Sequence, residues 1–359
     1  MGPHDFQPSV LVHMADTEPM AAVARATDPG FVFVPSVAHY DGVYFYTIAR
    51  DPLARGTEHP LIDRGGYRYE HPGFGWLGWL LSAGQPKLLP FALLIAALLG
   101  AGIAGAAAAL LAADLGLSYW WGLAVAFSPG VVYSVTVVTS ETAGLAALLV
   151  AVYAWRRDRR LIAAIALIAA CLIKEQFLAV PIGIGIYELV GALRTRAWRR
   201  RFSVRSFLRL FVPLAAGPLI FAVWYVYIWW QFIVPPIEGS RDFTGFPFVG
   251  WVDTVKLAAA YSTSGDFFAS QLGSITIPLL VIAGMALLAG SIASLRLNSE
   301  VQPTFVLLAL LAFSLNYWNL LYPKDLIRAL TTQLVLLPFV CAPGARARAR
   351  EAPGLESER

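Results

Sequence analysis

Long apolar segments separated by short polar stretches dominate the chain after residue 87. Nine such segments follow one another, at 88–113, 119–138, 140–155, 161–173, 176–193, 210–233, 274–294, 303–321 and 326–342. A helix of about 20 apolar residues crosses a hydrocarbon core about 30 Å thick. Several segments are shorter, so we expect short or paired helices with shallow outer turns. Because apolar residues run on without alternating with polar ones, a transmembrane β-barrel is excluded. The pattern predicts an all-α fold, a polytopic transmembrane helical bundle.

The composition agrees with a membrane protein. Of the 359 residues, 58% are hydrophobic and 14% are charged, and the mean hydropathy is +0.63. Soluble domains carry roughly 25% charged residues, so an ordinary soluble enzyme and a disordered chain are both excluded. The two cysteines, Cys171 and Cys341, imply no disulfide framework. The net charge of +4 bears on membrane topology, and we expect no nucleic-acid partner.

Basic runs orient the predicted bundle. They lie at 156–160, 194–209, Arg296 and 345–350, and basic residues concentrate in cytoplasmic loops. This orientation predicts an extracytoplasmic region over 1–86, a transmembrane helical domain over 87–342 and a cytoplasmic basic tail over 343–359. Tryptophans near the segment ends, such as Trp79 and Trp318, are expected to anchor the helices at the interfaces.

The N-terminal region conflicts with a simple topology. Nine spans with the C-terminus inside require the N-terminus outside, yet residues 1–38 hold no apolar segment typical of a signal peptide. A missing first helix would resolve the conflict, because ten spans place both ends inside. We therefore expect that such a helix is absent from, or replaced in, this sequence.

Once the chain is oriented, its unusual ionisable residues fall on the outer side. They are His39, Asp41, Asp51, Arg68, Glu70, His71, Glu141, Lys174, Glu175, Arg241, Asp242, Asp253, Lys324, Asp325 and Arg328. Polar groups at membrane depth are costly, usually face a cavity and often mark a functional site. We expect one charged, outward-facing cavity. Arg241 and Asp242 fit an ordinary polar loop, and no His, Asp and Glu spacing predicts a metal site.

The most informative stretch is residues 39–53. A helix over 41–50 would place Tyr44, Phe45 and Ile48 on one apolar stripe. Asp41 would lie at its N-terminus, where a carboxylate caps the first turn, and the Asp51-Pro52 step would end it. Capping and a functional role for Asp41 are equally compatible with this spacing.

The other candidates also have structural explanations. Lys174 and Glu175 are adjacent and would neutralise each other at a helix turn. Glu141 follows Ser140, and a helix-start cap is the favoured interpretation. Lys324 and Asp325 fit an interfacial pair in which the lysine snorkels. Arg328 lies one turn deeper, where a phosphate-binding role is more attractive.

Several stretches resemble bacterial glycosyltransferases of the GT-C superfamily. HYDGVYFYTIARDP (39–52) followed by YRYEHPGFGWLGWLLSAG (67–84) resembles the family's first external loop. TSETAGLAALLVAVYAWRR (139–157), CLIKEQFLAVPIG (171–183) and DLIRALTTQLVLLPF (325–339) are similar to later family segments. The resemblance implies a multi-pass enzyme of the bacterial plasma membrane and cell envelope that takes sugar from a polyprenyl-phosphate donor. Its acceptor would be an extracytoplasmic glycan, lipid or protein, and its catalytic base would be Asp41.

Physical chemistry agrees with that role. An attacking hydroxyl needs a carboxylate within hydrogen-bond reach, and a departing phosphate needs cations. Lys174, Arg328, Arg68 and Lys324 are the outer-face cations for the donor phosphate. Acceptor-binding or supporting roles would fall to His39, Tyr40, Tyr44, Glu70, His71, Glu141 and Glu175. No cofactor is indicated, although some relatives depend on a divalent metal.

Two other function classes remain open: a transporter or lipid-linked-sugar flippase, and an inactive accessory subunit. Transporters often contain repeated halves and polar residues at mid-membrane. No repeat is visible in this sequence, and its charges lie at outer helix ends. An inverting glycosyltransferase working at one face is therefore the favoured prediction.

Overall fold

The computed structural model describes residues 7–194, 204–233, 235–240 and 244–342. Within these ranges the regular structure is helical, and the β-type pairing consists of two isolated bridges, Ala15 with Val34 and Thr244 with Leu315. The all-α prediction is confirmed. The basic stretch 195–203, the Arg241–Asp242 pair and the basic tail 343–359 lie outside the described residues.

The N-terminal region folds into short helices around its own apolar core. Its elements are η1 (Pro8–Val12), α1 (Pro19–Thr27), η2 (Ser36–Ala38), α2 (Gly42–Arg50), η3 (His59–Leu61), α3 (Gly65–Tyr69) and α4 (Gly73–Leu81). The helix predicted over 41–50 is α2, and its stripe of Tyr44, Phe45 and Ile48 is buried as expected. The burial extends to every residue from 42 to 49, because η1, α4 and α5 pack against this helix.

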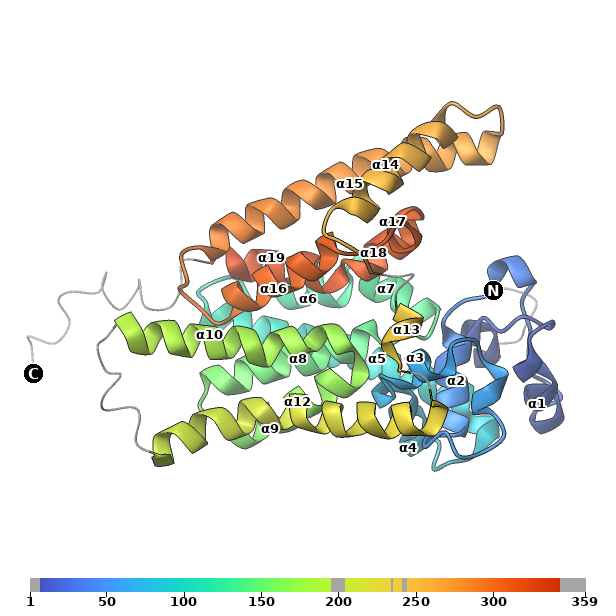
Figure 1. Ribbon diagram of the computed structural model, residues 1–359, viewed down its shortest axis with the longest axis horizontal. Coiled ribbons are helices and arrows are strands. Elements are labelled where there is room, and N and C mark those ends of the chain that lie inside the picture. The colour runs from blue at the N-terminus through green and yellow to red at the C-terminus, as the bar shows by residue number, and fades with distance from the viewer. Residues whose placement is uncertain (1–6, 195–203, 234, 241–243, 343–359) are drawn as a thin grey trace, which may run out of the picture.

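The remaining chain forms an elongated helical bundle, with α1 to α4 gathered at one end of it (Figure 1). Its elements are η4 (Pro86–Leu88), α5 (Leu89–Asp114), α6 (Trp121–Ala126), α7 (Pro129–Thr136), α8 (Glu141–Arg156), α9 (Arg160–Ile173), η5 (Glu175–Leu178), α10 (Ala179–Arg194), α12 (Val204–Phe232), α13 (Ile237–Ser240), α14 (Val249–Ser262), α15 (Phe267–Ser294), α16 (Val301–Phe313), α17 (Tyr317–Leu320), α18 (Pro323–Ala329) and α19 (Thr331–Val340).

Small residues allow the central helices to approach closely. A Cβ added at Gly100 of α5 would lie 2.7 Å from the backbone nitrogen of Ala143 in α8. Alanines 104, 107 and 108 of α5 are also buried. Close backbone packing through Gly and Ala is typical of helices that associate within a bilayer.

Four helices are long and apolar enough to span a membrane. They cover Pro86–Asp114, Glu175–Arg194, Leu208–Phe232 and Phe267–Ser294, and shorter apolar helices cover Arg160–Ile173, Val301–Phe313 and Thr331–Val340. These lengths and compositions indicate a membrane protein. The nine-span topology stays a prediction.

Four predicted segments differ in detail from the observed helices. Segment 119–138 is divided into α6 and α7, because Ser128 is extended and Pro129 starts a new helix. Segments 303–321 and 326–342 are each divided in two as well. Helix α15 begins at Phe267, seven residues before the predicted 274, because the side chain of Asp266 caps it by accepting from Ala269 N at 2.8 Å.

Ion pairs tie three helices together at the bundle end opposite the N-terminal region. Arg156, the last residue of α8, lies 3.2 Å from Asp114 and 3.1 Å from Glu300. Arg157 lies 2.8 Å from Asp114. Because Asp114 ends α5 and Glu300 precedes α16, the 156–160 basic run joins α5, α8 and α16 at this end.

Candidate functional site

Asp41 occupies the N-cap position of α2, but its side chain makes no capping hydrogen bond. Its Oδ2 accepts from Nη1 of Arg328 at 2.6 Å, and its Oδ1 lies 3.6 Å from Nη1 of Arg68. The capping interpretation of Asp41 is therefore wrong, because the carboxylate turns from the helix backbone toward two guanidinium groups.

The ion pairs continue from Arg328 to Glu141 and Lys174. Arg328 Nη1 lies 3.5 Å from Glu141 Oε1, and Lys174 Nζ donates to the same oxygen at 2.9 Å. Ser134 Oγ donates to Glu141 Oε2 at 3.5 Å. We call Asp41, Arg68, Glu141, Lys174 and Arg328 the Asp41 cluster.

Two structural interpretations of the sequence are corrected by this geometry. Glu141 was expected to cap a helix, but it is 3% exposed and its carboxylate binds Lys174 and Ser134. Lys174 and Glu175 were expected to neutralise each other. Lys174 instead pairs with Glu141, and Glu175 lies beside His71.

Close backbone contacts bring the parts of the Asp41 cluster together. A Cβ added at Gly42 would lie 2.9 Å from the carbonyl oxygen of Val137, so α2 begins directly against the chain that leads into α8. A Cβ added at Gly130 would lie 1.9 Å from Thr331 Oγ1, so α7 packs closely on the α18–α19 segment. These two contacts help to bring Asp41, Glu141 and Arg328 close together.

Positive charge exceeds negative charge within the Asp41 cluster, which has three cations and two carboxylates. Burial disfavours the charged form of Asp41, but Arg328 and Arg68 outweigh burial and hold the pKa of this carboxyl well below its usual range. Asp63, whose side chain is 54% exposed, lies 3.8 Å from Arg68 Nε at the edge of the cluster.

Aromatic rings support the cations. The guanidinium of Arg68 lies 3.6 Å from the ring centroid of Tyr44, and that of Arg328 lies 4.9 Å from the ring centroid of Tyr40. Cation–π contacts of this kind hold a cation without neutralising it.

Lys324 and Asp325 are bound separately. Lys324 is exposed and lies 5.0 Å from the ring centroid of Tyr40, and Asp325 accepts a hydrogen bond from the hydroxyl of Tyr40. Lys324 and Asp325 were expected to form an interfacial pair, but each of them contacts Tyr40 instead.

His39 belongs to a neighbouring hydrogen-bonded chain that the sequence did not predict. Its Nδ1 lies 2.5 Å from Glu18 Oε1, and its Nε2 lies 3.3 Å from the hydroxyl of Tyr44. The hydrogen bond to Glu18 raises the pKa of His39. No local pattern indicates Glu18, because it lies 21 residues before His39.

Glu70, His71 and Glu175 form a second polar group, which we call the Glu175 group. His71 Nδ1 lies 3.4 Å from Glu175 Oε2, and the ring centroids of His71 and Tyr67 are 5.6 Å apart. Burial, followed by the charge of Glu175, raises the pKa of Glu70 to about 8. Burial lowers the pKa of His71, so its imidazole is neutral at pH 7.

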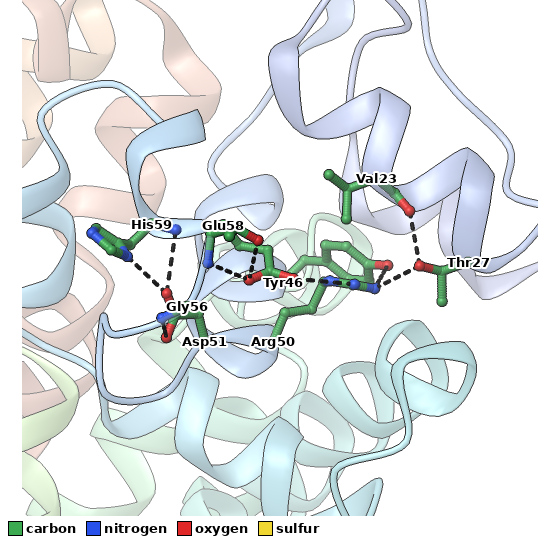
Figure 2. Close-up of polar contacts among 9 residues, drawn as sticks. Val23, Thr27, Tyr46, Arg50, Asp51, Gly56, Glu58 and His59 are labelled. Carbon is green, nitrogen blue, oxygen red and sulfur yellow. Dashed lines mark hydrogen bonds and ion pairs between the residues drawn. The ribbon is translucent and has the colours of Figure 1, made fainter.

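Asp51 has a structural role. It follows the last residue of α2, so the predicted helix end is confirmed. Its carboxylate accepts from the backbone nitrogens of Arg55 and Gly56 at 2.9 Å and contacts His59 Nδ1 at 2.9 Å. Figure 2 shows the contacts of Asp51 with Gly56 and His59 beside those of Arg50 with Thr27 and Glu58. Asp51 and Arg50 thus hold the loop after α2 against α1.

An apolar groove of about 210 Å³ runs between α6, α7, α18 and α19. Trp121, Val125, Ile327, Thr331 and Val335 are among its lining residues. Ile327 and Thr331 flank Arg328 in the chain, so the groove adjoins the segment that carries this cation of the Asp41 cluster.

Across the described residues, no group of three or more His, Cys, Asp or Glu side chains is arranged to hold a metal ion. The polar site described above is instead a carboxylate, Asp41, with the guanidinium groups of Arg328 and Arg68 beside it.

No family model matches the chain, and no curated protein or solved structure matches it.

Proposed function

We propose that the chain is a membrane glycosyltransferase that transfers a sugar from a polyprenyl-phosphate donor to an extracytoplasmic acceptor. The observation that carries this proposal is the contact of Asp41 with Arg328 at 2.6 Å, with Arg68 and Lys174 in the same cluster. The site thus combines a carboxylate that can accept a proton with cations that can bind a phosphate.

In the proposed reaction, Asp41 is the general base. It accepts the proton of the acceptor hydroxyl while the hydroxyl oxygen bonds to the anomeric carbon of the sugar. The bond from that carbon to the phosphate oxygen breaks, and the polyprenyl phosphate leaves with the bonding electrons. Attack on the face opposite the phosphate inverts the anomeric configuration.

Arg328, Arg68 and Lys174 would stabilise the charge that develops on the leaving phosphate. Guanidinium groups bind phosphate oxygens through paired hydrogen bonds, and Arg68 and Arg328 are steadied by Tyr44 and Tyr40. Lys324, exposed at Tyr40, would contribute at the edge of the site. Glu141 would position Lys174 and Arg328 by contacting both.

The apolar groove beside α18 supports a lipid-linked donor. Its lining is mostly hydrophobic, and an isoprenoid chain needs only such a surface. A lipid lying there would carry its phosphate toward the segment that holds Arg328.

We also propose a nine-span topology in the plasma membrane with the Asp41 cluster on the outer face. Arg156, Arg157 and Arg160 lie at the bundle end opposite Asp41, and the cytoplasmic side of a membrane protein is the side enriched in such residues.

Sugar transfer by membranes containing the full chain tests the proposed function. A panel of polyprenyl-phosphate hexoses serves as donor, and Asp41→Asn is expected to lower transfer at least a hundredfold, the usual effect of removing a general base. Asp158→Asn makes the same chemical change at the opposite end and is expected to leave transfer unchanged.

Lys174→Ala and Arg328→Ala are expected to raise the KM for donor more than the KM for acceptor. Full transfer by Asp41→Asn would reject the proposal. Movement of the sugar lipid across the bilayer without transfer would support the flippase alternative instead.

A further inference from the structure

The Glu175 group contains buried polar atoms that the protein leaves without hydrogen bonds. His71 is 9% exposed, and neither its Nδ1 nor Glu175 Oε2 has a hydrogen-bond partner. The two atoms lie 3.4 Å apart without hydrogen-bonding geometry. Leaving such atoms unsatisfied costs free energy, so a ligand that satisfies both is favoured.

Tight packing fixes this group beside the Asp41 cluster. A Cβ added at Gly73 would lie 2.9 Å from the backbone nitrogen of Ile173. The turn that carries Glu70 and His71 is thereby held against the chain that carries Lys174 and Glu175. The Glu175 side chain is 38% exposed as a whole, whereas its Oε2 is buried beside His71.

The chemistry of the group fits hydroxyl groups. A hydroxyl both donates and accepts, so it can give its hydrogen to a carboxylate and accept from a second donor. Glu175 is an acceptor, neutral His71 offers one donor and one acceptor nitrogen, and Glu70 is a donor when protonated. A phosphate or a uronic acid would meet the charge of Glu175, whereas an uncharged sugar would not.

We propose that His71 and Glu175, next to the buried side chain of Glu70, form a subsite that binds adjacent hydroxyl groups of an uncharged donor sugar. This inference rests on the proposed function. In a sugar phosphate lipid the sugar is bonded directly to the phosphate, and here Glu175 directly follows Lys174. In this proposal, Lys174 contacts the phosphate and Glu175 contacts the sugar.

Binding to the full chain in nanodiscs tests the subsite without requiring transfer. The probes are undecaprenyl phosphate alone and undecaprenyl phosphate carrying glucose, galactose, mannose or glucuronic acid. The wild type is expected to bind one neutral hexosyl lipid more tightly than the bare lipid and the glucuronosyl lipid.

Glu175→Gln and His71→Asn are each expected to weaken binding of that hexosyl lipid about tenfold, the effect of losing one hydrogen bond to a charged or buried group. Binding of the bare lipid is expected to stay unchanged. Glu188→Gln, which alters a carboxylate bonded to Trp155 elsewhere in the bundle, is the matched control. Melting temperatures of all variants establish that they fold.

The possible failures are distinguishable. If Glu175→Gln and His71→Asn weaken binding of the bare and the hexosyl lipid equally, or weaken neither, the subsite assignment is wrong and the proposed function is unaffected. A higher acceptor KM with unchanged hexosyl-lipid binding overturns the donor assignment. Absence of binding of every lipid to the wild type rejects the proposed function as well.

Discussion

At the N-terminal end of the bundle, the immediate surroundings of a carboxyl group determine its pKa. Asp41 and Glu70 both lie in the N-terminal region, yet their pKa values move in opposite directions. Burial is the first influence on both, but two arginines outweigh it at Asp41, whereas the nearby charge of Glu175 adds to it at Glu70. Asp41 is therefore ionised at neutral pH, and Glu70 is protonated.

Glu70 gives a prediction for the pH dependence of stability. Its pKa rises from its usual 4.5 to about 8 in the folded chain, so the folded state binds this proton more strongly than the unfolded state. The contribution of Glu70 to the free energy of unfolding therefore falls as pH rises from 4.5 to about 8. The side chain in Glu70→Gln does not ionise, so this contribution to the pH dependence of stability is absent from the variant.

We expect Glu70→Gln to raise the melting temperature more at pH 8.5 than at pH 5.5, measured on detergent-solubilised protein alongside the wild type. The same gain at both pH values would show that Glu70 is ionised in the folded chain.

At the scale of helices, glycines determine which segments can meet. Gly130 of α7 lies against Thr331 and Ile327, and Arg328, the residue after Ile327, contacts Glu141 of α8. Without this close packing at Gly130, Arg328 would lose its position between Asp41 and Glu141. The helix contacts and the polar site are thus two results of the same packing.

Gly130→Ala is expected to destabilise the protein by about 1–3 kcal/mol, because the new Cβ overlaps Thr331 Oγ1 and approaches the carbonyl oxygen of Ile327. Thr331→Ala is expected to relieve part of this loss by removing Oγ1. Gly102→Ala, where the added Cβ meets nothing within 4 Å, is the control and is expected to be neutral or stabilising. Thermal unfolding of the purified variants measures all three, and equal losses in Gly130→Ala and Gly102→Ala would refute the packing argument.

The sequence predicted the elements better than their contacts. Apolar runs located α5, α8, α9, α10, α12 and α15, because hydrophobicity is a local property of the chain. The division at Ser128 and Pro129 was readable in principle from the proline. The ion pair of Asp41 with Arg328 joins residues 287 positions apart, and no local pattern indicates such a pair. Capping was the natural local explanation for Asp41 and Glu141, and tertiary contacts replaced it at both.

At the scale of the whole molecule, two groups of ion pairs among the described residues lie at opposite ends of the bundle. Asp114, Arg156 and Glu300 fasten α5, α8 and α16 at one end, whereas the Asp41 cluster and the Glu175 group lie at the other. Figure 1 shows the N-terminal helices gathered at the second end alone. The two ends of the described bundle are therefore chemically different, and the proposed function assigns the chemistry to the end that holds the Asp41 cluster.

Labelling of introduced cysteines tests which face is outside. Val37 is 93% exposed in the N-terminal region, and the Asp158 side chain is 60% exposed at the opposite end. With Cys341 changed to serine, Val37→Cys is expected to react with a membrane-impermeant maleimide on intact cells. Asp158→Cys is expected to react only after the cells are permeabilised. The reverse result would invert the proposed topology.

The contacts of Asp41 have a consequence for the order of events at the site. Each oxygen of its carboxylate faces a guanidinium, Oδ2 that of Arg328 and Oδ1 that of Arg68. Under the proposed function, a carboxylate held in this way is a poor base toward water, which is far more abundant than any acceptor. An arriving donor phosphate would draw both arginines toward itself and release Asp41 at the moment a sugar is in place. The resting enzyme would thus be protected from wasteful hydrolysis of its donor, and the donor would bind before the acceptor.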